Sequence, residues 1–302
     1  MKYITFLPPG SPQSHIGMIT AENQVVDLTA KGQPANLLSL LHLGRNAWAE
    51  AESVSKESPP DYSLSQVTLQ APLLRPNTLR DFYAFEEHVA TANKNRGREV
   101  PEQWYQIPVF YFSNPHAVYG PGEDVPMPKY TQELDYELEV AAVIGTAGRD
   151  IRAEEAIQHI FGFTIFNDWS ARDVQRQEMK VGLGPAKGKD FASSFGPYII
   201  TPDELEDKST GKPSVYDLEM TACINGKEFS RGNWKTLYYS FGEMIERASA
   251  DVMLQPGDII GSGTVGTGCL LELTKAEGPW LKRGDVVELE IERLGTLRNK
   301  IS

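Results

Sequence analysis

Short apolar runs separated by polar residues open the chain. The runs at 3–7, 16–20 and 24–28 are typical of short strands. From about residue 34 to residue 55 leucines recur at helical spacing and Trp48 extends the same apolar side. This pattern predicts one helix after three strands.

A polar, proline-containing stretch at 56–63 follows this helix and predicts a linker. The chain has 302 residues, which is long for one hydrophobic core. We therefore expect a small N-terminal domain over residues 1–70 and a larger domain over residues 71–302.

Many short apolar runs make up the remainder of the chain, and only 153–160 and 241–249 predict helices. Asn225-Gly226 predicts a tight hairpin, because both residues tolerate a positive φ. This balance favours a β-rich α+β fold, a barrel or roll, over a doubly wound sheet. The predicted strands lie at 65–70, 109–113, 137–144, 162–166, 198–201, 218–224, 258–261, 270–273 and 286–291.

The composition is that of a globular protein, with 40% hydrophobic and 23% charged residues. The formal net charge of −12 argues against a nucleic-acid partner, which would require a basic surface. An acidic protein can still bind an anionic substrate where a metal or a few basic side chains reverse the local charge.

Two distant cysteines, Cys223 and Cys269, argue against a disulfide framework and suit a reducing compartment. Pro8, Pro9 and Gly10 interrupt the apolar N-terminus too early for a signal peptide. No apolar run approaches the roughly 20 residues of a membrane helix. We expect a soluble, cytoplasmic protein without a membrane partner.

A glycine-rich stretch over residues 261–266 matches the letters of a dinucleotide-binding fingerprint. That fingerprint requires a helix after the glycines, and the following CLLELT predicts a strand. We expect instead a loop whose glycines let the backbone approach another group closely.

Glu137 and Glu139 carry the strongest chemical signal. Residues two apart in a strand share one face, so both carboxylates would point the same way. Neighbouring carboxylates repel each other, and burial increases the repulsion. The pair therefore indicates either a solvated outer face or a cation site.

A second group of polar residues follows the apolar run at 162–166. Asp168 stands at the end of that strand, and Arg172 and Gln175 follow at a spacing that would stack them on one turn of helix. Asp168 could cap this helix or serve as a ligand, and it could do both.

Asp81 and His88 lie in a third segment, DFYAFEEH. A single histidine in an amphipathic segment is more often structural than catalytic. Together Asp81, Glu137, Glu139 and Asp168 would offer only oxygen ligands, which Mg²⁺, Mn²⁺ and Ca²⁺ prefer and zinc does not.

Five ordered blocks resemble the fumarylacetoacetate hydrolase family over roughly residue 75 to the C-terminus: DFYAFEEH, LDYELE, FNDWSARDVQ, GPAKGKDF and GSGTVGTGCLLEL. The resemblance implies a β-sandwich-roll catalytic domain, a homodimer and a Mg²⁺, Mn²⁺ or Ca²⁺ ion. It also implies roles for individual residues. The metal ligands would be Asp81, Glu137, Glu139 and Asp168; the catalytic residues His88, Glu272, Lys189 and Arg172; and the substrate contacts Tyr83, Arg96, Tyr111, Gln175 and Thr264.

The implied reaction is hydrolysis of a carbon–carbon bond in a small anionic diketo acid, fumarylacetoacetate or a related acylpyruvate. His88, oriented by Glu272, would activate water. Met179 replaces an expected tyrosine, which leaves open oxaloacetate decarboxylation, or isomerisation or hydration in aromatic-acid breakdown. A non-catalytic, metal-stabilised binding domain is a third alternative.

Overall fold

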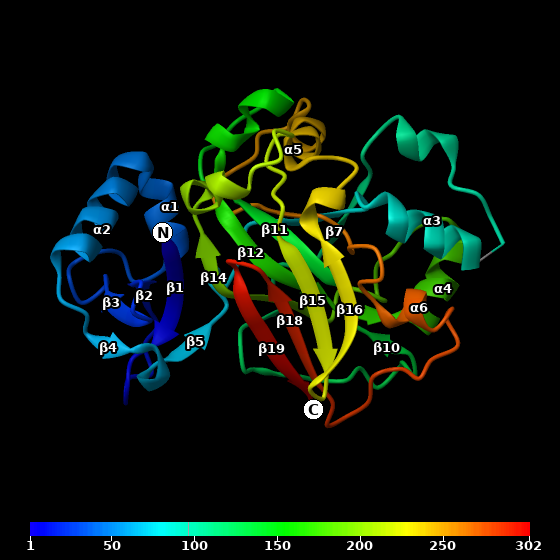
Figure 1. Cartoon of the computed structure of the whole chain (residues 1–302), viewed down its shortest axis with the longest axis horizontal. Coiled ribbons are helices and arrows are strands. Elements are labelled where there is room, and N and C mark those ends of the chain that lie inside the picture. Colours follow the sequence, from blue (N-terminus) through cyan, green and yellow to red (C-terminus); the bar gives the residue numbers. More distant parts are fainter. Residues whose placement is uncertain (96) are drawn as a thin grey trace.

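The computed structural model describes residues 1–95 and 97–302 (Figure 1). Arg96 lies outside the described residues. The strands are β1 (Lys2–Leu7), β2 (His15–Ile19), β3 (Gln24–Asp27), β4 (Tyr62–Ser63), β5 (Thr68–Gln70), β6 (Leu79–Phe82), β7 (Phe110–Ser113), β8 (Val118–Tyr119), β9 (Asp124–Val125), β10 (Leu134–Asp135), β11 (Leu138–Ile144), β12 (Ile160–Asp168), β13 (Ser170–Ala171), β14 (Ser193–Ile200), β15 (Glu219–Ile224), β16 (Lys227–Asn233), β17 (Ile259–Gly261), β18 (Val286–Ile291) and β19 (Gly295–Ile301).

The helices lie mainly around the sheets. They are α1 (Leu37–Leu43), α2 (Arg45–Glu57), α3 (Glu86–Asn95), α4 (Arg172–Val181), α5 (Phe241–Ser249) and α6 (Leu270–Leu273), with 3₁₀ turns η1 (Leu64–Gln66), η2 (Glu102–Tyr105), η3 (Ala153–Gln158), η4 (Pro202–Lys208) and η5 (Trp234–Thr236). Within the described residues, no helix is long and apolar enough to cross a membrane.

One large mixed sheet organises the molecule. Its order is β4-β3-β2-β1-β14-β12-β11-β17-β6-β7, with β5 beside β1 and β8 beside β14. A second sheet has the order β16-β15-β18-β19-β9, and β10 pairs with β13. The β-rich α+β fold expected from the sequence is confirmed.

Strand β11 shows how two apolar layers form on this sheet, because all seven of its residues are buried. Val140 and Ala142 join the core shared with residues of the second sheet. Ala141 and Val143 point to the other side, where they cluster with residues of α1 and α2. Burial on both faces explains why the strand is an unbroken apolar run after Glu139.

The N-terminal strands belong to the large sheet. Strand β1 pairs with β14, with Lys2 opposite Ile200, and α1 and α2 lie on the same side of the molecule as β1 to β5 (Figure 1). A division into domains at residue 70 stays a prediction. The single helix expected over 34–55 is two helices, because Gly44 takes a φ of 80° between them.

Most predicted strands occur within a few residues of their expected bounds. The hairpin at Asn225-Gly226 is confirmed, with φ values of 52° and 76°. The strand predicted at 270–273 is wrong, since these residues form α6. The helix predicted at 153–160 is a 3₁₀ turn that ends before β12.

Candidate active site

Four buried carboxylates meet where β6, β11 and β12 lie in one sheet. Asp81 lies in β6, Glu139 in β11 and Asp168 at the end of β12, while Glu137 immediately precedes β11. One oxygen of each lies within 4.8 Å of those of the other three. Glu137 and Glu139 are only 4% and 0% exposed, so a solvated outer face is the wrong interpretation of this pair.

Backbone pairing explains this convergence. Strands β11 and β12 run antiparallel with Leu138 opposite Asn167, and the Asn167 side chain accepts a hydrogen bond of 3.0 Å from the Glu137 N–H. On the other side, β17 pairs with β6 and places Gly261 opposite Asp81. A Cβ at Gly261 would lie 2.4 Å from Asp81 Oδ1, so only glycine leaves room for this carboxylate.

The carboxylates are electrostatically costly to each other. Burial, then repulsion from Asp168, raises the pKa of Asp81 to about 8. Burial, then repulsion from Asp81, raises the pKa of Glu139 well above its usual range. Burial raises the pKa of Asp168 to about 6, although Lys189 opposes this shift. For Glu137 the attraction of Lys189 and other nearby cations outweighs burial and lowers the pKa.

The donor set fits a divalent cation. The Lys189 ammonium contacts Glu137 and lies 2.5 Å from Asp168 Oδ2, which also accepts a hydrogen bond from the Tyr111 hydroxyl. Asp168 Oδ1 is buried without a hydrogen-bond partner. A buried carboxylate oxygen without a donor is stabilised by a cation, and oxygen-only sets suit Mg²⁺, Mn²⁺ or Ca²⁺. These residues could therefore hold such an ion.

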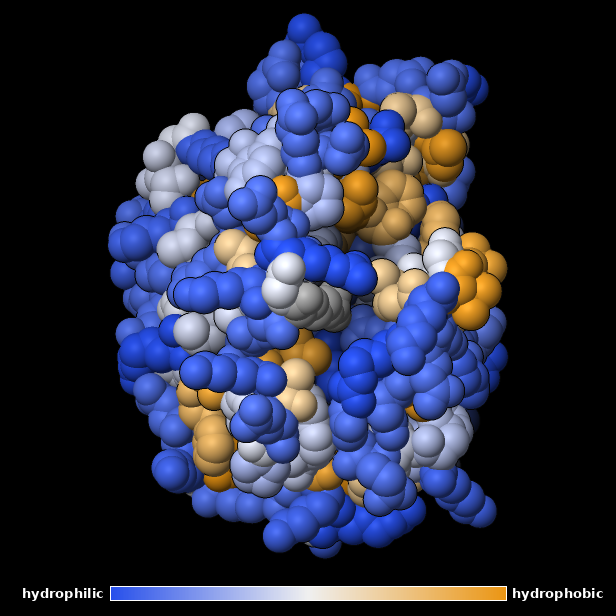
Figure 2. All heavy atoms as spheres, turned by 90° about the vertical axis from the view of Figure 1, so that its right-hand side faces the viewer, coloured by the Kyte–Doolittle hydropathy of each residue, from blue (hydrophilic) through white to orange (hydrophobic). Residues whose placement is uncertain are grey.

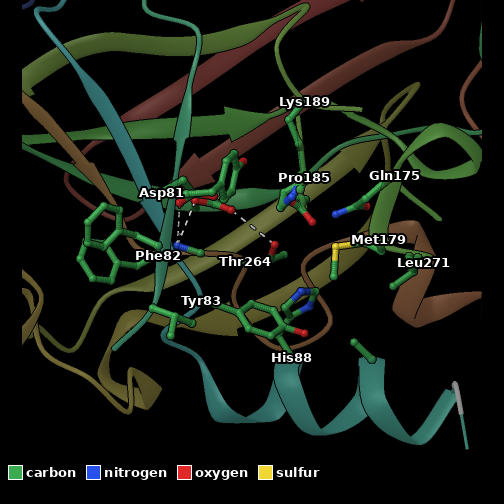
Figure 3. Close-up of a pocket in the computed structure, with 18 of the residues that line it drawn as sticks. Asp81, Phe82, Tyr83, His88, Gln175, Met179, Pro185, Lys189, Thr264 and Leu271 are labelled. Atoms are coloured by element: carbon green, nitrogen blue, oxygen red, sulfur yellow. Dashed lines mark hydrogen bonds and ion pairs between the residues drawn. The ribbon is translucent and has the colours of Figure 1, made fainter. Parts of the chain in front are cut away.

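His88 and Glu272 form a second buried pair. His88 lies in the first turn of α3, Glu272 lies in α6, and their Nδ1 and Oε1 atoms are 2.5 Å apart. Glu272 Oε2 accepts a hydrogen bond of 3.1 Å from the Thr267 N–H. The Tyr83 ring packs edge-on against His88 with centroids 5.3 Å apart (Figure 3). Because Nδ1 donates to the carboxylate, Nε2 is the ring nitrogen that can accept a proton.

The glycine-rich loop after β17 contacts both the four carboxylates and the His88–Glu272 pair. The Gly263 N–H donates to Asp81 Oδ1 and Glu139 Oε2, each at 3.1 Å, and the Thr264 hydroxyl lies 3.4 Å from Glu139 Oε1 (Figure 3). Gly263 has a φ of 77°, and a Cβ there would lie 2.5 Å from Phe82 O. The predicted close approach of this loop is confirmed. The helix α6 that follows it has only four residues.

Arg172 and Gln175 lie one turn apart at the start of α4, as their spacing predicts. Arg172 Nη1 donates to Gln175 Oε1 at 3.1 Å, and its Nη2 lies 2.8 Å from Glu137 Oε1. The N-cap of α4 is Ala171 and no side chain caps it. The alternative that Asp168 caps this helix is therefore wrong.

A pocket of about 310 Å³ joins these groups and opens on the face that carries α3, α4 and α6 (Figure 2). Met179 and Leu271 add apolar surface to its wall (Figure 3). Of the predicted site residues in the described part of the chain, Asp168 and Glu272 do not line it directly. Those that do are Asp81, Tyr83, His88, Tyr111, Glu137, Glu139, Arg172, Gln175, Lys189 and Thr264.

Sequence reasoning missed two contributors. The backbone N–H groups of the loop carry no sequence signal beyond the glycines themselves. Asp135, fully buried, bonds to Arg172 and to the start of α6. Its only sequence signal is an acidic residue between Leu134 and Tyr136.

Removal of divalent ions is expected to lower the melting temperature by about 5 °C relative to protein with Mn²⁺ at 100 times its Kd. The reason is that four buried carboxylates would then face one another with Lys189 and Arg172 alone to balance their charge. Differential scanning fluorimetry with EDTA, with Mn²⁺ restored and with NaCl at matched ionic strength measures this shift. An unchanged melting temperature with EDTA would contradict a resident ion.

Comparisons with known proteins identify the relatives of this chain. Residues 77–302 match the family model described as fumarylacetoacetate (FAA) hydrolase C-terminal. A mitochondrial oxaloacetate tautomerase of Homo sapiens is 28% identical over 305 residues, covering 100% of this chain and 91% of that protein. A 2,4-didehydro-3-deoxy-L-rhamnonate hydrolase of Sphingomonas sp. is 32% identical over 221 residues, covering 72% of this chain and 70% of that protein.

A solved structure extends the likeness to the whole chain. The fumarylacetoacetate hydrolase of Exiguobacterium antarcticum is 27% identical, with a TM-score of 0.76 over 100% of this chain and 99% of that one. The family match covers most of the chain and includes all the residues of the pocket. This chain therefore belongs to the fumarylacetoacetate hydrolase family.

Proposed function

We propose that this protein catalyses keto–enol isomerisation of a small 2-oxo acid of the oxaloacetate type. The observation that carries the proposal is a buried His–Glu pair whose histidine lines the same pocket as three members of a buried four-carboxylate group that could hold a cation. Proton transfer beside a carbonyl requires a base near the carbon and positive charge near the oxygen. This pocket offers both.

The reaction balances without a co-reactant. His88 Nε2 takes a proton from the methylene carbon next to the keto group, and the electrons of that C–H bond form the C=C bond. The carbonyl π electrons move to oxygen, which gains a proton from solvent, and the His88 imidazolium releases its proton to solvent, so that no net proton is consumed. Glu272 stabilises the imidazolium that forms, since its carboxylate lies against Nδ1.

The metal ligands in this proposal are Asp81, Glu137, Glu139 and Asp168. When bound, a divalent ion would supply the positive charge that stabilises negative charge on the substrate oxygens. Lys189 lies beside two of these carboxylates and keeps its positive charge there, because Asp168 and Glu137 outweigh burial and raise its pKa.

Substrate contacts are assigned by position in the pocket. Gln175 and Thr264 present polar groups to the pocket, and Tyr83, beside His88, and Tyr111, beside Asp168, also line it. Arg96, the remaining predicted contact, is proposed from its place in the sequence alone. Positive charge from the ion and Lys189 would let an acidic protein accept an anionic substrate.

The relatives support isomerisation better than hydrolysis. The human relative matches over the full length of this chain and is an oxaloacetate tautomerase. The carbon–carbon hydrolase expected from the sequence is therefore the second candidate. The Sphingomonas relative is a hydrolase, and the same His88–Glu272 pair could activate water.

The test follows the decay of freshly dissolved enol oxaloacetate by its ultraviolet absorbance, with protein and Mn²⁺ or with protein and EDTA. We expect Mn²⁺-dependent acceleration over the spontaneous rate, with no pyruvate formed. Pyruvate from oxaloacetate would instead indicate decarboxylation. Cleavage of acetylpyruvate to acetate and pyruvate, with no effect on the enol, would favour hydrolysis, and no turnover of either would favour a binding domain.

A homodimer and a cytoplasmic location stay predictions. The human relative is a mitochondrial protein.

A further inference from the structure

Asp135 connects the two halves of the active site without lining the pocket. It ends β10, is 0% exposed, and lies two residues before Glu137. Strand β10 pairs with β13, which places Asp135 opposite Ser170 and therefore near the start of α4. A carboxylate buried this completely requires several donors to offset the loss of water.

One set of donors belongs to the segment that carries Glu272. Asp135 Oδ1 accepts a hydrogen bond of 2.8 Å from the Leu270 N–H, and Oδ2 accepts one of 3.0 Å from the Leu271 N–H. These groups are the first N–H donors of α6, which have no partner within the helix. Asp135 thereby holds the turn from which Glu272 reaches His88.

The other donors belong to Arg172. Asp135 Oδ2 accepts a hydrogen bond of 2.9 Å from Arg172 Nε and lies 2.8 Å from Nη2. The same Nη2 lies 2.8 Å from Glu137 Oε1, and Nη1 donates to Gln175. Asp135 therefore fixes the guanidinium that contacts a carboxylate of the cation site.

We propose that Asp135 is a positioning residue that sets the placement of the His88–Glu272 pair relative to the Arg172–Glu137 side of the site. It acts through α6 and Arg172. The expected loss of activity rests on the proposed function, whereas the placement of His88 is measured independently of it. Residues that orient catalytic groups from behind typically change activity or metal affinity about 10- to 100-fold when replaced.

The test uses Asp135→Asn in the metal-loaded full chain. Asparagine keeps the shape but loses the charge and replaces one acceptor oxygen with an NH₂ donor, so it cannot keep all of the hydrogen bonds that Asp135 accepts from α6 and Arg172. Asp258→Asn is the matched control. Asp258 is also a buried acid, 2% exposed, bonded to a backbone N–H and paired with a buried arginine, Arg80, but it does not line the pocket.

For Asp135→Asn we expect kcat to fall about 10- to 100-fold with KM changed less than about threefold. Asp258→Asn should change kcat less than about threefold even if its melting temperature falls equally. In a Glu272→Gln background, adding Asp135→Asn should cost less than about threefold, because both changes act on one pair. The same extra loss in both backgrounds would overturn the proposal.

A spectroscopic measurement separates this proposal from the proposed function. The ¹⁵N imidazole signals of His88, assigned by their loss in His88→Ala, are recorded with Mg²⁺ at one pH. Asp135→Asn should shift them and Asp258→Asn should not. Shifts in both variants or in neither would overturn the positioning role. If Asp135→Asn shows the expected shift but the unmodified protein has no isomerase activity, only the proposed function is overturned.

Discussion

His88→Ala is expected to lower the rate of enol isomerisation at saturating substrate by about 10²–10⁴-fold, while the Kd for Mn²⁺ changes less than about threefold. His88 bonds to Glu272 and lies outside the group of four carboxylates that could hold the ion. The substitution therefore removes the base and leaves the cation site intact. Steady-state kinetics and isothermal titration with Mn²⁺ measure the two effects separately.

His159→Ala is the control for this variant. His159 is part-buried and its Nδ1 bonds to the backbone oxygen of Thr146, away from the pocket. It should retain nearly full activity. If His88→Ala loses Mn²⁺ binding as strongly as turnover, the assignment of His88 as the base is wrong.

Glu139→Gln is expected to weaken Mn²⁺ binding by at least about 10-fold and to lower activity at limiting Mn²⁺ by a similar or larger factor. Glu139 offers one of the four oxygens of the cluster, and glutamine offers a neutral oxygen in its place. The same substitution should raise the melting temperature of metal-free protein. Burial, then repulsion from Asp81, raises the pKa of Glu139, so this carboxyl group destabilises the metal-free fold at any pH above the ordinary range of a glutamate, and glutamine removes this cost.

Glu228→Gln supplies the comparison, because Glu228 lies on β16 and pairs with exposed Arg231. It should change neither Mn²⁺ affinity nor turnover. Unaltered Mn²⁺ affinity in Glu139→Gln would mean that the ion binds elsewhere. A lower melting temperature of metal-free Glu139→Gln, relative to the metal-free unmodified protein, would contradict the repulsion between the Glu139 and Asp81 carboxylates.

Much of the four-carboxylate group could be predicted from the sequence, because its signals are local. Glu137 and Glu139 lie two residues apart at the start of a strand, and Asp168 closes an apolar run. Glu137 precedes β11 and is not part of it, yet both carboxylates still reach the same cluster. What the local pattern left open was burial, which depends on the layers that cover both faces of the sheet.

The surroundings of Glu272 could not be predicted in the same way. Leu270 to Leu273 form a helix in place of the expected strand, and four apolar-rich residues are too few for periodicity to distinguish the two. The donors of that turn bond to Asp135, which is 135 residues away in the chain from Leu270. Long-range partners of this kind override local preference and leave no trace in the nearby sequence.

The loop from Gly263 to Thr267 has a consequence for how this pocket can diverge. Its backbone N–H groups bond to Asp81 and Glu139 at one end and to Glu272 at the other. The number of residues between those donors therefore sets the spacing between the four-carboxylate group and the His88–Glu272 pair. Substitution of Thr264 would alter substrate preference without changing this spacing. Insertion or deletion of one residue in the loop would instead change the distance between the four carboxylates and the His88–Glu272 pair. New specificities are thus accessible by substitution within this loop, and changes in its length are not.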